Sequence, residues 1–152
     1  MNARTIVAAI AMCVATAMAA GDTADHRQSA PSPAYLQALR VTDLFLDAWL
    51  NRDADTGLAL MSSAILLGGP RGRDHVSAEL RQYMTGLSNP HHEAFEISRG
   101  SGIGPDRFAF PVRLLELYTG ETTGVAISDT LEVVRQGDEW RVDRLPRRDN
   151  PD

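Results

Sequence analysis

The stretch from Arg107 to Leu145 reads RFAFPVRLLELYTGETTGVAISDTLEVVRQGDEWRVDRL. Apolar and polar residues alternate along it, which is the period of a β-strand that buries one of its faces. Two segments, 120–124 and 136–138, interrupt the alternation with glycine and predict turns. The stretch therefore predicts three consecutive antiparallel strands, the last of which carries Trp140.

The alternation slips once within the first of these strands. Phe110 lies on the predicted inward face, and Leu117 continues that face only if a β-bulge lies near Arg113–Leu114. The alternating segment 95–97 predicts another strand upstream, and the glycine-rich segment 100–105 predicts the loop between them. A one-residue error in this register would exchange the inward and outward side chains of half a strand.

Before residue 90 the apolar residues recur at helical spacing. They predict a first helix over Ala34–Leu50 and a short second helix around Leu58–Met61, with Asp53 and Asp55 as its candidate caps. A third helix begins at Asp74 and ends at Gly86. The predicted fold class is α+β, with about three N-terminal helices packed on a strongly curved antiparallel sheet of four or more strands. Such a fold encloses a cone-shaped pocket.

The first residues resemble an export signal rather than part of the fold. Arg4 precedes the apolar segment 6–16, and Ala17-Met18-Ala19 has the small-x-small pattern of a cleavage site. An uncleaved anchor is the alternative. We therefore expect a periplasmic or secreted bacterial protein, with no membrane insertion after cleavage. The predicted organisation is a signal peptide over 1–19, a flexible linker over 20–32, a domain over 33–146 and a polar tail over 147–152.

The composition excludes several kinds of chemistry. Cys13 lies in the predicted signal, so the mature chain has no thiolate nucleophile, disulfide or cysteine-bound metal. All 15 basic residues are arginine, which excludes a lysine Schiff base. The net charge of -5 becomes -6 without Arg4, and an acidic chain argues against nucleic-acid binding.

Two segments carry a resemblance to a known family. Phe45–Asn51 with Asp53 resembles the end of the first helix in the nuclear transport factor 2-like (NTF2-like) superfamily, and Asp138–Val142 resembles its closing hairpin. The superfamily includes ketosteroid isomerase, scytalone dehydratase and the SnoaL-like cyclases. The resemblance implies the cone-shaped fold and, as is common in the superfamily, a homodimer through the sheet face. It does not imply one function, because this fold hosts many.

The resemblance to ketosteroid isomerase lacks that enzyme's reactive groups. The position of its helix-one tyrosine is occupied here by Phe45, which has no hydroxyl. The position of its proton-shuttling aspartate falls in Leu67–Pro70, which has no carboxylate. An isomerase of this kind needs both an acid–base group and an oxyanion donor, so this reaction is not expected.

Asp129 is the charged residue that interrupts the inward pattern of its predicted strand. A carboxylate in a pocket would have a raised pKa and could act as a general acid or base. Alternatively, a bulge turns Asp129 to solvent, or the residue pairs with an arginine of a neighbouring strand. As for a metal site, His91 and Glu93 could converge on one face of a strand, but two ligands make a poor zinc site.

We predict an exported, non-catalytic domain that binds a small apolar molecule or a protein partner through its pocket or its sheet face. The residues expected to line the pocket are Phe45, Trp49, Tyr83, Phe110, Leu117, Tyr118 and Trp140. Arg71 and Arg73 are candidate anion contacts at the start of the third helix. The alternative is a SnoaL-like or dehydratase-type enzyme that uses Asp129 with Tyr83, Tyr118 or His91. No cofactor and no metal are expected.

Overall fold

The structure is a computed structural model that describes residues 31–67, 73–86, 91–118, 120 and 124–147, with the backbone alone at 73–77. The predicted signal peptide lies outside these residues. The helices are α1 (Pro33–Leu50), α2 (Ala54–Ala59), α3 (Ser63–Leu67) and α4 (Arg73–Thr85). The strands are β1 (His91–Ile97), β2 (Ser101–Gly104), β3 (Arg107–Leu117), β4 (Val125–Gln136) and β5 (Glu139–Arg144). No described helix is both long and apolar enough to cross a membrane.

Capping hydrogen bonds and a glycine with a positive φ mark the helix ends. The Ser32 hydroxyl accepts the Tyr35 backbone N–H at 3.1 Å and caps α1. Asp53 accepts the Thr56 N–H at 3.0 Å and caps α2. After α4, Gly86 adopts a positive φ of 67°, which glycine tolerates without strain. Helices α1 and α2 and the end of α4 were predicted. The predicted start of α4 at Asp74 is wrong, because the helix begins at Arg73, and α3 was not predicted.

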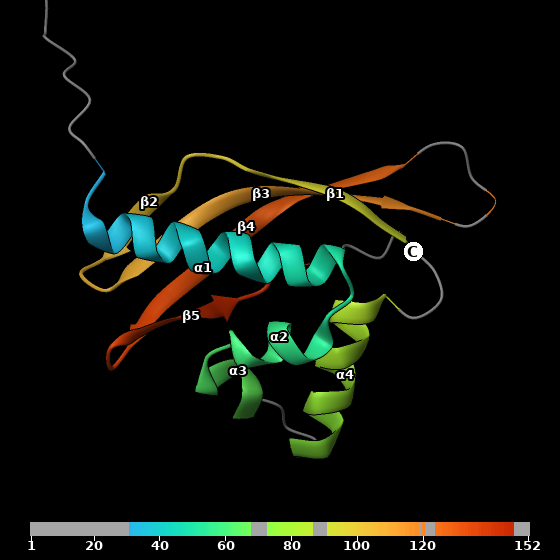
Figure 1. Ribbon diagram of the computed structural model, residues 1–152, viewed down its shortest axis with the longest axis horizontal. Coiled ribbons are helices and arrows are strands. Elements are labelled where there is room, and N and C mark those ends of the chain that lie inside the picture. The colour runs from blue at the N-terminus through green and yellow to red at the C-terminus, as the bar shows by residue number, and fades with distance from the viewer. Residues whose placement is uncertain (1–30, 68–72, 87–90, 119, 121–123, 148–152) are drawn as a thin grey trace, which may run out of the picture. The chain divides into compact units, whose positions relative to one another are not determined.

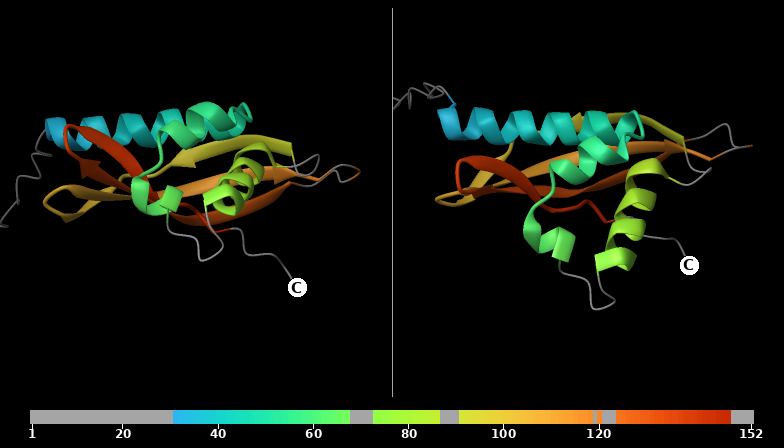
Figure 2. Two further views of the ribbon diagram at one scale, coloured as in Figure 1. Left: turned by 90° about the horizontal axis from the view of Figure 1, so that it is seen from below. Right: turned by 60° about the horizontal axis from the view of Figure 1, so that its bottom comes forward.

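The sheet is antiparallel, with the strand order β1-β3-β4-β5 and with β2 paired to the beginning of β3. Helix α1 lies along one face of the sheet, and the other helices gather beside β5 and the end of α1 (Figures 1 and 2). The segment between α2 and α3 follows the β5 edge, where Val142 donates to the Leu60 carbonyl and accepts from the Ser62 N–H. The predicted α+β class is confirmed.

The bulge predicted in β3 is wrong. Ten consecutive residue pairs join β3 to β4, from Arg107–Val134 to Glu116–Val125. The irregularity instead lies in β1, where the pairing with β3 shifts between His92 and Ala94. As a result Glu116 faces α1, and Leu117 follows it on the opposite face. The predicted loop over 100–105 is also wrong in part, because it contains β2.

The hydrophobic core fills the space between α1 and the sheet. Phe45 and Trp49 of α1 are fully buried against Phe110 of β3 and Leu131 of β4. Trp140 of β5 contacts Phe108, with ring centroids 5.5 Å apart. Burial of such aromatic side chains supplies much of a small domain's stability.

Candidate functional site

The seven residues predicted to line a pocket fall into two groups. Phe45, Trp49, Phe110 and Trp140 belong to the packed core. Tyr83, Leu117 and Tyr118 are partly exposed. Leu117 lies on the face opposite to that of the core residues, because the β3 register continues without a bulge. The structure thus places part of the predicted set together as core, and ligand contact by these residues remains a prediction.

Asp129 is held by three neighbours. It lies on the part of β4 that extends beyond its pairing with β5. One carboxylate oxygen lies 3.0 Å from the guanidinium of Arg144 and accepts the Thr130 N–H at 2.7 Å, and the other accepts the Arg147 N–H at 2.7 Å. The alternative in which Asp129 pairs with an arginine of a neighbouring strand is therefore the one observed.

The electrostatics of Asp129 are the reverse of those expected for a general acid. Burial raises the pKa of this carboxyl, but the N–H groups of Arg147 and Thr130 and the charge of Arg144 outweigh burial. The net result is a pKa below the ordinary value. The sequence-based expectation of a raised pKa is wrong, because it considered burial without these donors.

The same carboxylate anchors the segment that follows β5. Pro146 is fully buried, and its carbonyl accepts the Tyr83 hydroxyl at 3.2 Å. Residues 145–147 thereby connect the β4 edge, through Asp129, to α4, through Tyr83. Asp129 therefore has a structural role, because it holds the segment that follows β5 in place.

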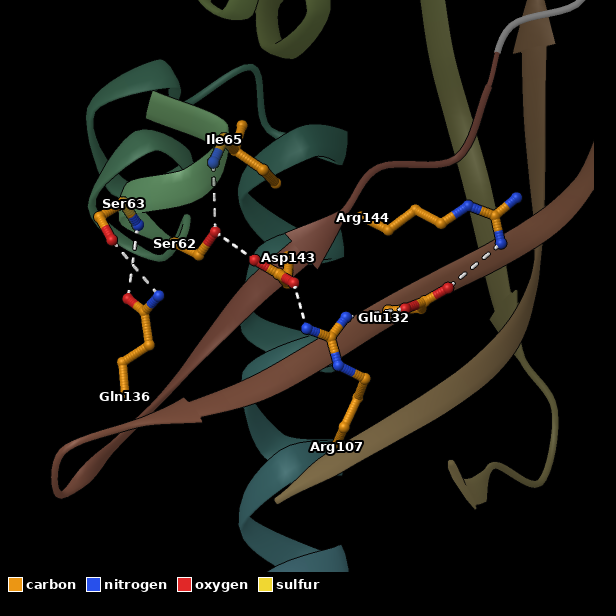
Figure 3. Close-up of polar contacts among 8 residues, drawn as sticks. All are labelled: Ser62, Ser63, Ile65, Arg107, Glu132, Gln136, Asp143 and Arg144. Carbon is orange, nitrogen blue, oxygen red and sulfur yellow. Dashed lines mark hydrogen bonds and ion pairs between the residues drawn. The ribbon is translucent and has the colours of Figure 1, made fainter. Parts of the chain in front are cut away.

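A chain of ion pairs continues from Arg144 across the strands (Figure 3). Arg144 lies 3.5 Å from Glu132, which also contacts Arg107 at 3.0 Å. Arg107 then reaches Asp143 at 2.7 Å. Asp143 accepts the hydroxyl of Ser62 at 2.6 Å, so that the network ends at the start of α3. Its charged members pair with one another and tie β3, β4 and β5 together.

The interior contains a polar cluster that sequence reasoning missed. His92 and Glu116 are directly opposite on β1 and β3, and their side chains are 0% and 1% exposed. His92 Nε2 lies 3.7 Å from Glu116 Oε1. The imidazole stacks on the Trp49 indole, with centroids 3.7 Å apart and an interplanar angle of 11°. Its Nδ1 lies 2.6 Å from the Trp49 carbonyl oxygen.

This contact fixes the tautomer of His92. A carbonyl oxygen only accepts hydrogen bonds, so Nδ1 carries a proton and donates it to Trp49. Nε2 therefore faces the carboxylate of Glu116. Their separation is too long for a direct hydrogen bond but within the range of an ion pair.

The histidine next to it has a different environment. His91 is exposed, and its Nδ1 lies 3.0 Å from the guanidinium of Arg52, which follows α1 with a positive φ of 59°. Within the described part of the chain, no group of three or more His, Cys, Asp or Glu side chains could hold a metal ion. Arg71 lies outside the described residues, as does the side chain of Arg73. Anion binding there remains a prediction.

The face of the sheet turned away from α1 carries exposed side chains, and no described helix lies over it (Figure 2). We call this the outer sheet face, and its residues are Ala94, Glu96, Ser98, Pro111, Arg113, Leu115, Ala126, Ser128 and Thr130. A hollow of about 100 Å³ in it is lined by Ala94, Phe95, Glu96, Arg113 and Leu115. Glu96 and Arg113 form an exposed ion pair at 3.7 Å.

Neither a protein-family model nor a curated protein sequence matches the chain. Several solved structures are similar to it. A ketosteroid isomerase-like protein from Erwinia carotovora atroseptica has 17% identity and a TM-score of 0.58, over 75% of this chain and 94% of that one. A protein from Pseudomonas putida, described as NTF2-like and of unknown function, has 16% identity and a TM-score of 0.54, over 72% and 81%. A structure from Thiobacillus denitrificans, described as a calcium/calmodulin-dependent protein kinase type II association domain, has 21% identity and a TM-score of 0.52, over 74% and 90%.

The described domain therefore belongs to the class of α+β proteins in which helices pack into the curve of an antiparallel sheet. Its particular fold is the NTF2-like fold, and the resemblance found in the sequence is confirmed. At these identities the likeness concerns the fold alone.

Proposed function

We propose that this chain is an exported, non-catalytic binding domain that docks a protein partner on its outer sheet face, and that this partner is a second copy of the chain. The carrying observation is the outer sheet face itself. It is exposed, it has a hollow between the edge strand β1 and β3, and no described helix lies over it. An open sheet face that combines small side chains with one balanced ion pair is a surface on which another protein can pack closely.

The charges of this face favour a second copy as the occupant. The whole chain carries a net charge of -5, so that two copies repel each other on average. At the outer sheet face, however, Glu96 and Arg113 balance each other. A two-fold axis through this face can bring the carboxylate of one copy near the guanidinium of the other. The similar Thiobacillus denitrificans structure is described as an association domain, which supports the same use of the fold.

The test is sedimentation equilibrium of residues 20–152 with a bulky charge placed on the outer sheet face. We expect the unaltered chain to have the mass of a dimer, and Ala126→Arg to have the mass of a monomer. Ala64→Arg is the matched control, because Ala64 is exposed on α3 and away from this face. A monomeric unaltered chain, or equal dimerisation by both variants, would contradict the proposal. Export is tested separately by the N-terminal residue of the secreted protein, which should be Ala20.

A small molecule bound in the interior is the second candidate function. The favouring observation is the indole N–H of Trp49, which is buried and has no hydrogen-bond acceptor among the described residues. An acid–base enzyme based on Asp129 receives less support, because its carboxylate oxygens already bind Arg144, Thr130 and Arg147. Its lowered pKa also keeps it ionised at neutral pH.

A further inference from the structure

Strand β4 has a stretch with an open edge. Its pairing with β5 starts at Glu132, so residues 125–131 extend beyond β5 (Figure 1). The opposite edge of this stretch is paired with β3 as far as Val125. No described strand pairs with residues 125–131 on the side of β5. Backbone groups on that side can therefore bind another chain.

The register shows which residues turn their backbone groups to this edge. Ser98 donates its N–H to the Pro111 carbonyl, so Pro111 turns its backbone groups towards β1. Thr130 lies opposite Pro111 and therefore turns its own groups away from β3. Backbone groups alternate in direction along a strand, so Ser128 and Ala126 also face the open edge. Both of these residues are exposed.

The other described edges of the sheet are protected. The segment between α2 and α3 hydrogen-bonds to Val142 and covers β5. The pairing of β1 with β3 shifts between His92 and Ala94, and β2 has only four residues. Covering segments, irregular pairing, short strands, charges and prolines all discourage the addition of a further strand. Residues 125–128 have no charge and no proline, and their pairing with β3 is regular, so this edge favours such an addition.

The side chains along this edge define the segment that fits it. Val125, which is 45% exposed, and the half-buried Ile127 lie on the core side of the sheet. Ala126 and Ser128 lie on the outer sheet face. The side chains of an added strand alternate between these two sides. Apolar side chains are favoured beside Val125 and Ile127, and small or polar ones are favoured on the other side.

A second copy of β4 fits this edge less well. A two-fold pairing centred on Ile127 places Val125 opposite the other copy's Asp129. A pairing centred on Ser128 places Ile127 there instead. Because the Asp129 carboxylate is ion-paired, either register places an apolar side chain against charged groups.

We propose that the open edge of β4, over residues 125–128, binds an extended segment of a partner protein in which apolar side chains alternate with small polar ones. The N–H and C=O groups of Ala126 and Ser128 form the backbone hydrogen bonds with this segment. Its apolar side chains pack beside Val125 and Ile127. This interaction goes beyond the proposed function, because it uses the edge of a strand and leaves the outer sheet face free for the dimer.

Amide hydrogen exchange tests the edge directly. Residues 20–152 are followed by ¹H–¹⁵N NMR with and without the peptide acetyl-TVTVT-amide. We expect the Ser128 amide to exchange rapidly in the free chain, and about tenfold more slowly at a peptide concentration about ten times the dissociation constant. The Ile127 amide faces β3 and should be protected in both states. Unchanged exchange at Ser128 would overturn the proposal. Slow exchange there without peptide would also overturn it, because residues 148–152 or a second copy would then occupy the edge.

Two methylated peptides test the predicted placement of the side chains. N-methylation of the central threonine removes an N–H that faces β4, whereas N-methylation of a neighbouring valine removes one that faces away. We expect the first to weaken binding by about tenfold or more and the second to change it little. An equal loss, or a larger loss from the valine methylation, would contradict the proposal.

A substitution removes the same hydrogen bond from the protein. Ser128→Pro deletes the N–H that faces the open edge, where a strand tolerates proline, and Ser128→Ala is the matched control. We expect the proline variant alone to lose peptide binding, and equal binding by both would overturn the proposal. The methylated peptides decide the point if the proline variant does not fold. The exchange measurement is repeated on Ala94→Arg, which charges the outer sheet face away from β4, so that failure of the edge is distinguished from failure of the dimer.

Discussion

At the residue scale, Asp129 shows how one side chain can break a pattern without taking part in chemistry. The sequence marks it as a charge on the inward side of β4. The structure places it where β4 outlasts its partner β5, so that its carboxylate binds Arg144 and the Arg147 N–H. The contacts of Asp129 depend on where the pairing of β4 with β5 ends, and the residues next to Asp129 in the sequence do not show this. A carboxylate with several donors is a structural anchor.

Asp129→Asn should therefore destabilise the domain by about 1–2 kcal/mol, since hydrogen bonds to charged groups contribute about 1.5–3 kcal/mol and the amide keeps one acceptor. Chemical denaturation measures the loss. Asp138→Asn is the control, because Asp138 is fully exposed and its ion pair with Arg135 is a surface contact. Similar stability of both variants would contradict the anchoring role.

The stability difference between the unaltered chain and Asp129→Asn should also depend on pH. The pKa of Asp129 is lowered in the folded state, so its stabilising contribution is fully present above the unfolded pKa of about 3.9. It disappears as the pH falls through the folded pKa. The difference in unfolding free energy between the unaltered chain and Asp129→Asn should stay constant from about pH 5 to 8 and shrink below about pH 4. A difference that grows on acidification would indicate a raised pKa instead.

His92 and Glu116 are the residues that sequence reasoning missed. In a β3 strand without a bulge, strict alternation from Phe110 places Glu116 on the inner face of the sheet. A buried carboxylate there needs a partner. The identity of that partner could not be predicted, because it depends on the irregular pairing of β1.

Glu116→Ala should destabilise the domain by about 1–3 kcal/mol, because it removes the carboxylate that faces the buried Nε2 of His92 and leaves that polar group without this neighbour. The double substitution His92→Leu with Glu116→Met should cost less than the sum of its two single changes, by about 1 kcal/mol or more. Urea denaturation provides these values. Glu96→Ala, which breaks an exposed pair, should stay within about 0.5 kcal/mol of the unaltered chain. Additive effects at His92 and Glu116 would show that the two side chains do not interact.

At the scale of elements, helices were easier to predict than strand register. Capping residues and apolar spacing are local signals, and they located α1, α2 and the end of α4. The Leu114-Leu115 doublet in β3 resembled a slip in alternation, yet Leu115 is accommodated on the half-buried outer side of the sheet. Helix α3 escaped prediction because five residues are too few for a visible period.

The cap of α2 gives a test at this scale. Asp53 accepts both the N–H and the hydroxyl of Thr56, at 3.0 and 2.6 Å. Asp53→Ala should lower the unfolding free energy, and Asp53→Asn, which keeps an acceptor oxygen, should retain most of the stability. Thermal denaturation compares them. Equal stability of the alanine and asparagine variants would mean that the hydrogen bonds of this cap contribute nothing.

At the scale of the whole molecule, the fold leaves two surfaces for function. The described interior between α1 and the sheet is mainly apolar and contains the polar cluster at Trp49, and the outer sheet face is open and formally neutral. The fold class and the NTF2-like likeness could be predicted from strands and caps. The choice between the interior and the outer sheet face could not be predicted, because it depends on which side chains point to each face of the sheet.

The central claim is that a second copy covers the outer sheet face. Residues 20–152 contain no cysteine, so Ser128→Cys and Ala64→Cys each supply a single thiol, one on this face and one on α3. The direct measurement is the rate of thiol labelling across a series of protein concentrations. We expect labelling at position 128 to slow by about tenfold once the concentration is far above the dimer dissociation constant, while labelling at position 64 stays constant. A rate at position 128 that does not depend on concentration would contradict the account.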